Sequence, residues 1–139
     1  MLVAKDFMNW HPSQLPPEAL EFLGERHLAT LSIPRQGRSP HVTPVGFTWD
    51  DNTATARVIT FADAQKVKLV QKAEPAMVSL CQVDGGRWLA LEGQAQVHSD
   101  QERCSEGVRR YAERYRPPKD RGADRRVIEI SVQRVIGRI

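Results

Sequence analysis

The stretch AMVSLCQVDGGRWLALEGQAQVH, residues 76–98, holds two strand-like runs on either side of a short turn sequence. The turn is Asp84-Gly85-Gly86, and Asp-Gly and Gly-Gly pairs tolerate the positive φ angles that tight hairpin loops require. The stretch therefore predicts a β-hairpin. Gly93 in its second arm indicates a bulge or a close approach of another backbone segment.

Four other segments alternate apolar and polar residues with the period of a β-strand. They are residues 27–34, 41–50, 56–61 and 125–139. Short polar turns separate most of them, so neighbouring runs are expected to pair as antiparallel strands. With the hairpin, these runs predict about six strands.

Three short helices are predicted between the strands. The first follows Pro16, and the second begins close to Lys66. The third begins at a capping box formed by Ser99 and Glu102 and ends before Pro117. Because few helices separate the strands, the pattern favours a mainly β fold with an antiparallel sheet or small barrel over a doubly wound parallel sheet.

The chain has 139 residues, which is enough for one domain with a core and too few for two ordinary domains. It contains no run of about 18 apolar residues, and its N-terminus lacks the pattern of a signal peptide. We therefore expect a soluble, cytoplasmic protein without a membrane partner. Cys81 and Cys104 are far apart and form no metal-binding pattern, which predicts buried or free thiols.

The formal charge of +3 is unevenly distributed along the chain. Residues 114–126 are strongly basic and residues 16–25 are acidic, which favours an anionic ligand. Nucleic acid is disfavoured as a partner, because the basic residues are not interleaved with aromatic residues and no helix-turn-helix, zinc or RNP pattern occurs. Patterns typical of dinucleotide-binding loops, P-loops, nucleophile elbows and zinc hydrolases are also absent.

Residues 60–75, TFADAQKVKLVQKAEP, place Lys66 close to the start of a helix. A cation is unfavourable there, because the unpaired N–H groups of the first turn already carry partial positive charge. A bound phosphate would reverse the effect, since the N–H groups and the ammonium group would both attract it. Two alternatives remain open: Lys66, Lys68 and Lys72 form a solvated helix surface, or Asp63 caps the helix.

Two further side chains are candidate ligand contacts. His41 can be a base, a ligand contact or an ordinary strand residue. Because no second histidine or carboxylate stands at metal-ligand spacing from it, neither a catalytic nor a metal-binding role is supported. Trp88 directly follows the hairpin turn, and it either stacks on a planar ligand or belongs to the core or an interface.

Three segments taken together resemble the split-barrel flavin and deazaflavin reductases related to pyridoxamine 5′-phosphate oxidase. They are SPHVTPVGFTWD (39–50), ARVITFADAQK (56–66) and SLCQVDGGRWLALEGQAQV (79–97), and the resemblance extends over most of the chain. It implies a six-stranded antiparallel split β-barrel over residues 15–139, preceded by an N-terminal extension, residues 1–14. It also implies a homodimer that holds its cofactor in a groove between the subunits.

The resemblance also implies which residues bind the cofactor. The segment from Thr60 to Lys66 would hold its phosphate, the strand from His41 to Gly46 would lie along its ring, and Trp88 would approach from the second subunit. The implied cofactor-binding residues are His41, Pro44, Val45, Gly46, Thr60, Ala64, Gln65, Lys66 and Trp88. Asp63 departs from the glycine-rich turn of the relatives, and the C-terminus lacks the Arg-x-His of the pyridoxamine phosphate oxidases, which disfavours that activity.

The implied function is that of a coenzyme F420-dependent oxidoreductase, which transfers a hydride from the reduced deazaflavin to a conjugated double bond. The substrate would be anionic and conjugated, such as the linear tetrapyrrole biliverdin, which would give bilirubin. Lys68, Arg57 and Arg87 are candidates for a basic rim. Two alternatives stay open: an FMN-binding oxidoreductase on the same fold, and a non-catalytic protein that binds a deazaflavin or a tetrapyrrole. No residue is assigned a catalytic role.

Overall fold

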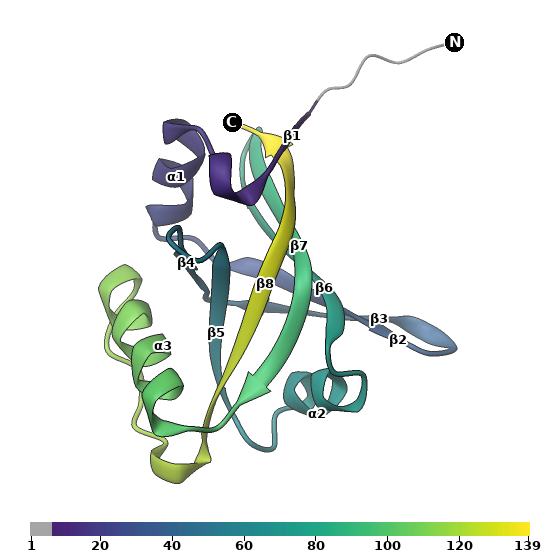
Figure 1. Cartoon of the computed structure of the whole chain (residues 1–139), viewed down its shortest axis with the longest axis vertical. Helices are drawn as coiled ribbons and strands as arrows, with labels where there is room; N and C mark the ends of the chain where they lie inside the picture. The colour runs from purple at the N-terminus through teal and green to yellow at the C-terminus, as the bar shows by residue number, and fades with distance from the viewer. Residues whose placement is uncertain (1–6) are drawn as a thin grey trace.

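The computed structural model describes residues 7–139, and its centre is an antiparallel sheet of eight strands (Figure 1). The strand order is β3-β2-β6-β7-β8-β5-β4, and β1 pairs with β8 outside this path. The strands are β1 (Met8–Trp10), β2 (Ala29–Arg35), β3 (Arg38–Val45), β4 (Thr48–Asp50), β5 (Thr55–Phe61), β6 (Ala76–Asp84), β7 (Arg87–His98) and β8 (Arg125–Arg138). The prediction of a mainly β, antiparallel fold is confirmed.

The structure has more strands than the sequence indicated, because two strands of only three residues, β1 and β4, join the six longer ones. β1 pairs with the C-terminal part of β8, beyond the residues that pair with β5, as in the pair of Trp10 with Val135. Part of the expected N-terminal extension therefore pairs with the sheet, and residues 1–6 lie outside the described residues. The domain boundary at residue 15 stays a prediction.

Residues 41–50, expected as one strand, form β3 and β4 with a break at Gly46 and Phe47. The backbone of Phe47 finds its partners on a helix instead of a strand. Its N–H donates to the Tyr115 hydroxyl over 3.2 Å, and its carbonyl oxygen accepts a 2.5 Å hydrogen bond from Arg114. These side-chain partners replace ladder hydrogen bonds, so pairing ends at this point.

Three helices pack against the sheet: α1 (Pro17–Gly24), α2 (Gln65–Lys72) and α3 (Gln101–Arg114). Two short 3₁₀ turns, Pro12–Gln14 and Gly122–Asp124, precede α1 and β8. The N-cap of α3 is Asp100 and not Ser99, because the Asp100 carboxylate accepts the hydrogen bond from the backbone N–H of Arg103. None of the helices within residues 7–139 is long and apolar enough to cross a bilayer.

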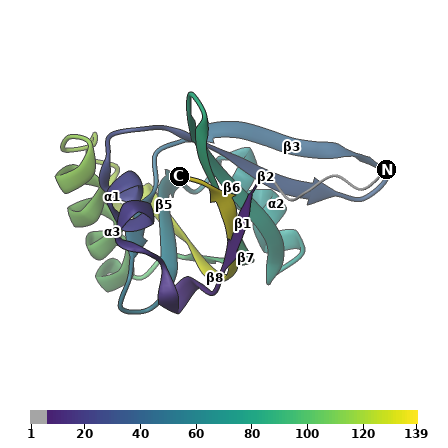
Figure 2. The same cartoon turned by 90° about the horizontal axis from the view of Figure 1, so that it is seen from above.

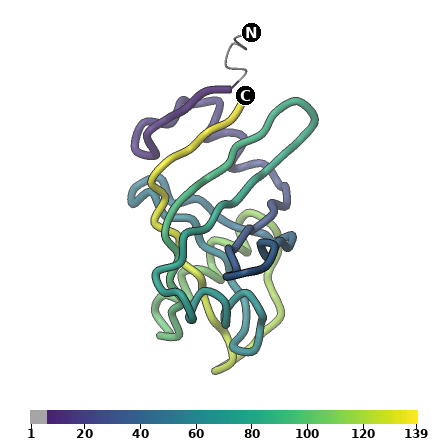
Figure 3. The backbone as a smooth tube through the Cα atoms, turned by 90° about the vertical axis from the view of Figure 1, so that its right-hand side faces the viewer, coloured from purple at the N-terminus to yellow at the C-terminus, as the bar shows by residue number. Residues whose placement is uncertain are grey.

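The core lies on the inner side of the curved sheet, where its fully buried side chains come from most of the strands and from α1. The largest of them are Phe22, Phe47, Leu31, Ile33, Leu80, Leu89, Leu91, Ile128 and Ile130. The β2–β3 hairpin projects beyond the rest of the sheet (Figure 2). The tip of the β6–β7 hairpin lies at the end of the molecule that also holds the C-terminus (Figure 3).

The β6–β7 hairpin forms as its turn sequence predicts, with Gly85 at a φ of +61°. The expected irregularity at Gly93 is confirmed as well, because the β7–β8 register shifts between Glu92 and Gly93. A Cβ atom on Gly93 would overlap the carbonyl oxygen of Ser131. The close approach of β8 therefore requires glycine at this position.

Candidate cofactor site

The first turn of α2 is open to a ligand. Its N-cap is Ala64, an extended residue whose methyl side chain provides no hydrogen bond to the helix. Asp63, the capping residue offered by one interpretation of the sequence, does not take this position. The first-turn N–H groups are therefore uncapped by any side chain, which is the arrangement that binds anions at helix N-termini.

Lys66 lies in this first turn, and its side chain is half-buried. Within residues 7–139 its ammonium group makes no hydrogen bond and no ion pair. Burial lowers the pKa of Lys66, because a desolvated ammonium group loses hydration that no partner among residues 7–139 replaces. An anion bound at the helix start would supply the missing partner.

A cleft of about 260 Å³ opens beside Lys66. Its lining comes from the end of β3, the second half of β5, the start of α2, the face of α3 and the segment that leads into β8. The lining residues are Pro44, Val45, Gly46, Val58, Ile59, Thr60, Phe61, Lys66, Tyr111, Pro118, Lys119, Arg121 and Arg125. Four of them are cationic and none is acidic, so the cleft is suited to an anionic ligand.

The pairing of β5 with β8 brings the basic segment to this cleft. Phe61 lies opposite Arg125 in the register, and the backbone N–H of Ala62 donates to the carbonyl oxygen of Asp124 over 2.9 Å. The guanidinium group of Arg121 lies 4.2 Å from the centre of the Phe61 ring. Residues far apart in the chain thus form one wall.

Three polar atoms near the cleft are buried without a hydrogen-bond partner: Thr60 Oγ1, His41 Nδ1 and Thr43 Oγ1. Thr60 is only 4% exposed and lines the cleft itself. Burial, followed by the positive charges of Arg35 and Lys66, lowers the pKa of His41 and favours its neutral form. Unpartnered buried polar groups are rare in folded proteins, and a ligand can satisfy them.

The end of α3 fixes the wall formed by Gly46. A Cβ atom on Gly46 would lie 2.9 Å from the Tyr111 ring and 3.1 Å from the Tyr115 ring. The Tyr115 hydroxyl also donates to the carbonyl oxygen of His27 over 2.6 Å. Glycine at position 46 therefore allows α3 to pack directly against the cleft wall.

The structure brings most of the residues expected at the cofactor together. Those that line the cleft are Pro44, Val45, Gly46, Thr60 and Lys66, while Ala64 and Gln65 stand beside it at the start of α2. His41 is outside the lining, although the positive charge of Lys66 contributes to lowering its pKa.

Trp88 is remote from this cleft within one chain. It lies at the start of β7, pairs with Arg138 and contacts the Phe7 ring at a centroid distance of 5.7 Å. Trp88 does not line the cleft of the same chain. Its expected contact with the cofactor of a second subunit stays a prediction.

The expectation for individual basic residues differs from the structure. Arg57 forms ion pairs with Asp50 at 3.0 Å and Glu129 at 3.2 Å, and neither it, Arg87 nor Lys68 lines the cleft. Eight of the thirteen lining residues were not among those expected from the sequence, and four of these eight carry a polar or charged side-chain group: Tyr111, Lys119, Arg121 and Arg125. The signal was present in the basic run 114–126, but the sequence alone did not show which strand would carry it to the cleft.

A larger hollow of about 660 Å³ lies between α3 and the segment that precedes β8. It shares Pro118, Lys119, Arg121 and Arg125 with the cleft. None of the nine residues expected to bind the cofactor lines it, whereas five of them line the smaller cleft beside Lys66.

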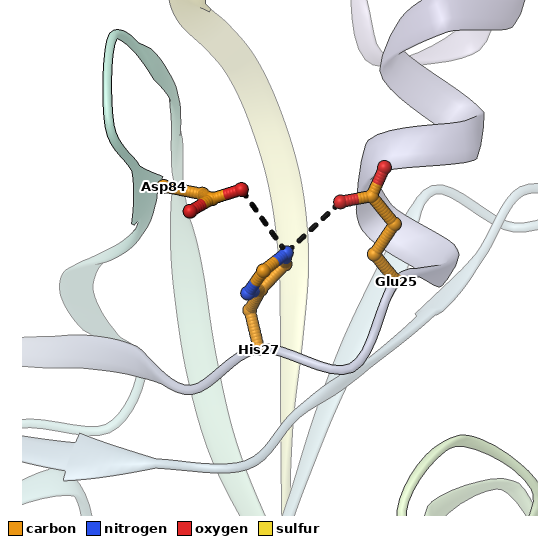
Figure 4. Close-up of side chains that lie close together, drawn as sticks. All are labelled: Glu25, His27 and Asp84. Atoms are coloured by element: carbon orange, nitrogen blue, oxygen red, sulfur yellow. Dashed lines mark hydrogen bonds and ion pairs between the residues drawn. The ribbon is translucent and has the colours of Figure 1, made fainter.

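A second cluster, of two carboxylates and a histidine, lies where the end of α1 approaches the β6–β7 hairpin (Figure 4). His27 Nε2 lies 2.9 Å from a Glu25 oxygen and 3.7 Å from an Asp84 oxygen, and the three ligand atoms are close enough to surround a metal ion. Arg87, however, donates to Glu25 at 2.9 and 3.0 Å and to Asp84 at 2.7 Å. Because its guanidinium group already neutralises both carboxylates, we interpret the group as an ion-pair cluster.

Comparison with known proteins places the chain among relatives of the same fold. Residues 15–138 match the family described as pyridoxamine 5′-phosphate oxidase. An F420H2-dependent biliverdin reductase from Mycobacterium tuberculosis (strain CDC 1551 / Oshkosh) is 47% identical over 125 residues, which are 90% of this chain and 89% of that protein.

Solved structures confirm the split β-barrel fold. An F420 reductase, 23% identical, has a TM-score of 0.68 and covers 87% of this chain and 98% of its own. A conserved hypothetical protein from Mycobacterium tuberculosis, 21% identical, has a TM-score of 0.72 and covers 88% of this chain and 82% of its own. At these identities the likeness concerns the fold alone.

Proposed function

Because the chain belongs to the pyridoxamine 5′-phosphate oxidase family, we propose that it is a coenzyme F420-dependent reductase built on that family's fold. The observation that carries the proposal is the 47% identity to an F420H2-dependent biliverdin reductase across 90% of this chain. The cleft supports it independently, since four cations and no acid line the space in which an anionic cofactor would lie.

The residues present are suited to that cofactor. The open N-terminus of α2 and the ammonium group of Lys66 would hold its phosphate group, and Thr60 offers a buried hydroxyl without a partner. Backbone groups from Pro44 to Gly46 would lie along the ring system. When bound in its reduced form, the deazaflavin supplies a hydride, while the protein orients the two reactants and excludes water.

The proposed acceptor is a conjugated double bond in an anionic molecule, with biliverdin as the first candidate. The name of the similar mycobacterial protein supports this choice, and so does the excess of positive charge at the cleft. No side chain is assigned a catalytic role, because binding and orientation are the functions that the lining residues can perform.

The proposed assembly is a homodimer. The outward face of β2, β3 and β6 exposes Val42 (54%), Met77 (53%) and Val83 (61%). These residues share one face, because Val42 pairs with Ser32 and Ser32 with Ser79, which has the same side-chain direction as Met77 and Val83. A second copy would cover this apolar face and bring its Trp88 towards the cleft.

Light scattering after size exclusion tests this assembly. It should give twice the mass of one chain, and a monomer would contradict the proposed homodimer.

The test of the function is a titration of cofactor-free protein with oxidised F420 and, separately, with FMN. We expect tight, selective binding of F420, which Lys66→Ala weakens about thirtyfold because a charge-assisted contact of about 2 kcal/mol is lost. Lys72→Ala is the matched control, since Lys72 is exposed in the last turn of the same helix.

Binding is followed by assays of turnover with reduced F420 and biliverdin. We expect the reduction of biliverdin to form bilirubin. Preference for FMN would replace the proposal with a flavin-dependent oxidoreductase. Binding of F420 without reduction of biliverdin or other conjugated acceptors would indicate a carrier protein, and binding of neither cofactor would reject the assignment.

A further inference from the structure

The cations of the cleft come from two separate parts of the chain. Lys66 is provided by α2, whereas Lys119, Arg121 and Arg125 belong to the segment before and at the start of β8. The proposed phosphate contact uses only the first part. Three cationic side chains of the lining are therefore without an assigned role.

Arg125 is the most constrained of these three cations. Its guanidinium group donates to two carbonyl oxygens, Thr60 O at 3.3 Å and Lys119 O at 2.5 Å, and it has no carboxylate within 4.0 Å among residues 7–139. Burial and the nearby charge of Arg121 lower the pKa of Arg125, although Asp120 and Asp124 act in the opposite direction. Its positive charge is therefore incompletely balanced by the protein.

Arg121 is held in a way that leaves its charge available. Its guanidinium group stacks on the Phe61 ring at 4.2 Å, and its nearest carboxylate oxygen, on Asp124, is 3.7 Å away. This separation is longer than a charge-assisted hydrogen bond. Lys119 makes no side-chain hydrogen bond or ion pair within the described part of the chain. Arg121 and Arg125 thus form a cationic pair at one wall of the cleft.

We propose that Arg121 and Arg125, with Lys119 beside them, bind a second anionic group of the bound molecules, distinct from the phosphate held by Lys66 and α2. Like charges placed together on one wall of a cleft favour a carboxylate or phosphate between them, and guanidinium groups bind such groups through two parallel hydrogen bonds. The inference rests on the proposed function, in which the cleft holds an anionic cofactor and an anionic substrate. The second anionic group belongs to one of these two molecules.

Two substitutions test the proposal and identify the source of the anionic group. Arg121→Gln and Arg125→Gln are measured for the Kd of F420 and for the KM of biliverdin, with Arg134→Gln as the control, an exposed arginine outside the cleft that pairs with Glu92 at 3.0 Å. An increase of about tenfold in the Kd of F420 would place the group on the cofactor. A similar increase in KM with unchanged Kd would place it on the substrate. Unchanged values of both would overturn the proposal.

A second probe separates this inference from the proposed function. Inorganic pyrophosphate is titrated into the cofactor-free wild-type protein and into Arg121→Gln, and its binding is followed by calorimetry. Weaker binding to the variant supports the anion site even if F420 fails to bind, and equal binding overturns it.

The hydrogen bonds of Arg125 require a control for folding. Arg125→Lys keeps the charge at this position, so we expect it to bind F420 or biliverdin more tightly than Arg125→Gln. Equal losses in the two variants would show that the charge is not responsible, and would overturn the role of Arg125.

Discussion

Two groups of cations at opposite ends of this molecule differ in what surrounds them. In the hairpin-end cluster of Glu25, His27, Asp84 and Arg87, the arginine lies 2.7–3.0 Å from carboxylate oxygens. Figure 4 shows the other three side chains of this cluster. In the cleft, Lys66, Lys119, Arg121 and Arg125 line a space that contains no acidic residue. The cleft has four lysine and arginine side chains and the hairpin-end cluster has one arginine. What distinguishes the structural group from the binding group is whether the described part of the chain places carboxylates in direct contact with the cations.

The two sites differ in which groups compensate the positive charges. At the hairpin end, Glu25 and Asp84 connect the end of α1 with the β6–β7 hairpin through Arg87. In the cleft, Arg121 has a carboxylate only at 3.7 Å, on Asp124, and Lys66 and Arg125 have none within 4.0 Å among residues 7–139, so an anionic ligand would add most of the compensation there. Substitutions at the first site should therefore change the stability of the fold, and substitutions at the second should change binding.

The largest expected effect is that of Arg114→Met. Arg114 adjoins the hairpin-end cluster and donates to the carbonyl oxygen of Glu25 at 2.9 Å, to that of Phe47 and to the Gln82 side chain, both at 2.5 Å. Methionine removes all three hydrogen bonds and leaves the buried Gln82 side-chain oxygen without its donor. The Glu25 carbonyl oxygen keeps the His27 N–H at 3.0 Å and the Phe47 carbonyl oxygen keeps the Tyr115 hydroxyl at 3.2 Å. The free energy of unfolding should fall by about 3 kcal/mol in urea titrations. Arg109→Met, on the exposed side of α3, is the control and should have a much smaller effect. Equal losses would contradict a special role for Arg114.

The next prediction compares Lys66→Met with Arg87→Met. Removing Lys66 should leave the free energy of unfolding unchanged within about 0.5 kcal/mol, because its ammonium group has no partner in the described chain. Removing Arg87 should lower it, because two carboxylates lose their counter-charge. Chemical denaturation of the cofactor-free variants provides both values. A larger loss for Lys66→Met than for Arg87→Met would reverse the assignment of the two groups.

A third prediction concerns acid. Hydrogen bonds from Arg87 and then His27 lower the pKa of Glu25 from 4.5 to about 2. Its contribution to stability is therefore complete above the unfolded-state pKa and disappears as the pH falls from about 4.5 to about 2. The denaturation midpoint of the wild type should fall more between pH 5 and pH 3 than that of Arg87→Met. Parallel pH profiles would show that the ion pair contributes nothing.

The smallest predicted effect is alkaline weakening of anion binding at the cleft. Burial lowers the pKa of Lys66, so its ammonium group loses its proton at a lower pH than an ordinary lysine. The Kd of F420 should rise between pH 8 and pH 10, and Lys66→Arg should remove this dependence because guanidinium stays charged. An unchanged pH profile in Lys66→Arg would assign the effect to another group.

Local features of the fold were predictable because each depends on neighbours in the chain. The Asp84-Gly85-Gly86 turn forms the expected hairpin, and Gly93 stands at the expected irregularity. The break at Gly46 was not predictable, because the partners of Phe47 are Arg114 and Tyr115 on a distant helix. Similarly, the capping of α3 by Asp100 instead of Ser99 is decided by which carboxyl or hydroxyl oxygen reaches the first turn.

The sequence by itself determined the alternating strands, the tight hairpin turn and the position of Lys66 at the start of α2, because these features arise from backbone preferences and side-chain direction within a few residues. It also showed a basic run at 114–126. Only the tertiary structure decided which cations form close ion pairs with carboxylates and which line the cleft. That decision depends on the register of β5 with β8, which brings Arg125 to Thr60 across 65 positions of the chain, a pairing that no local pattern specifies.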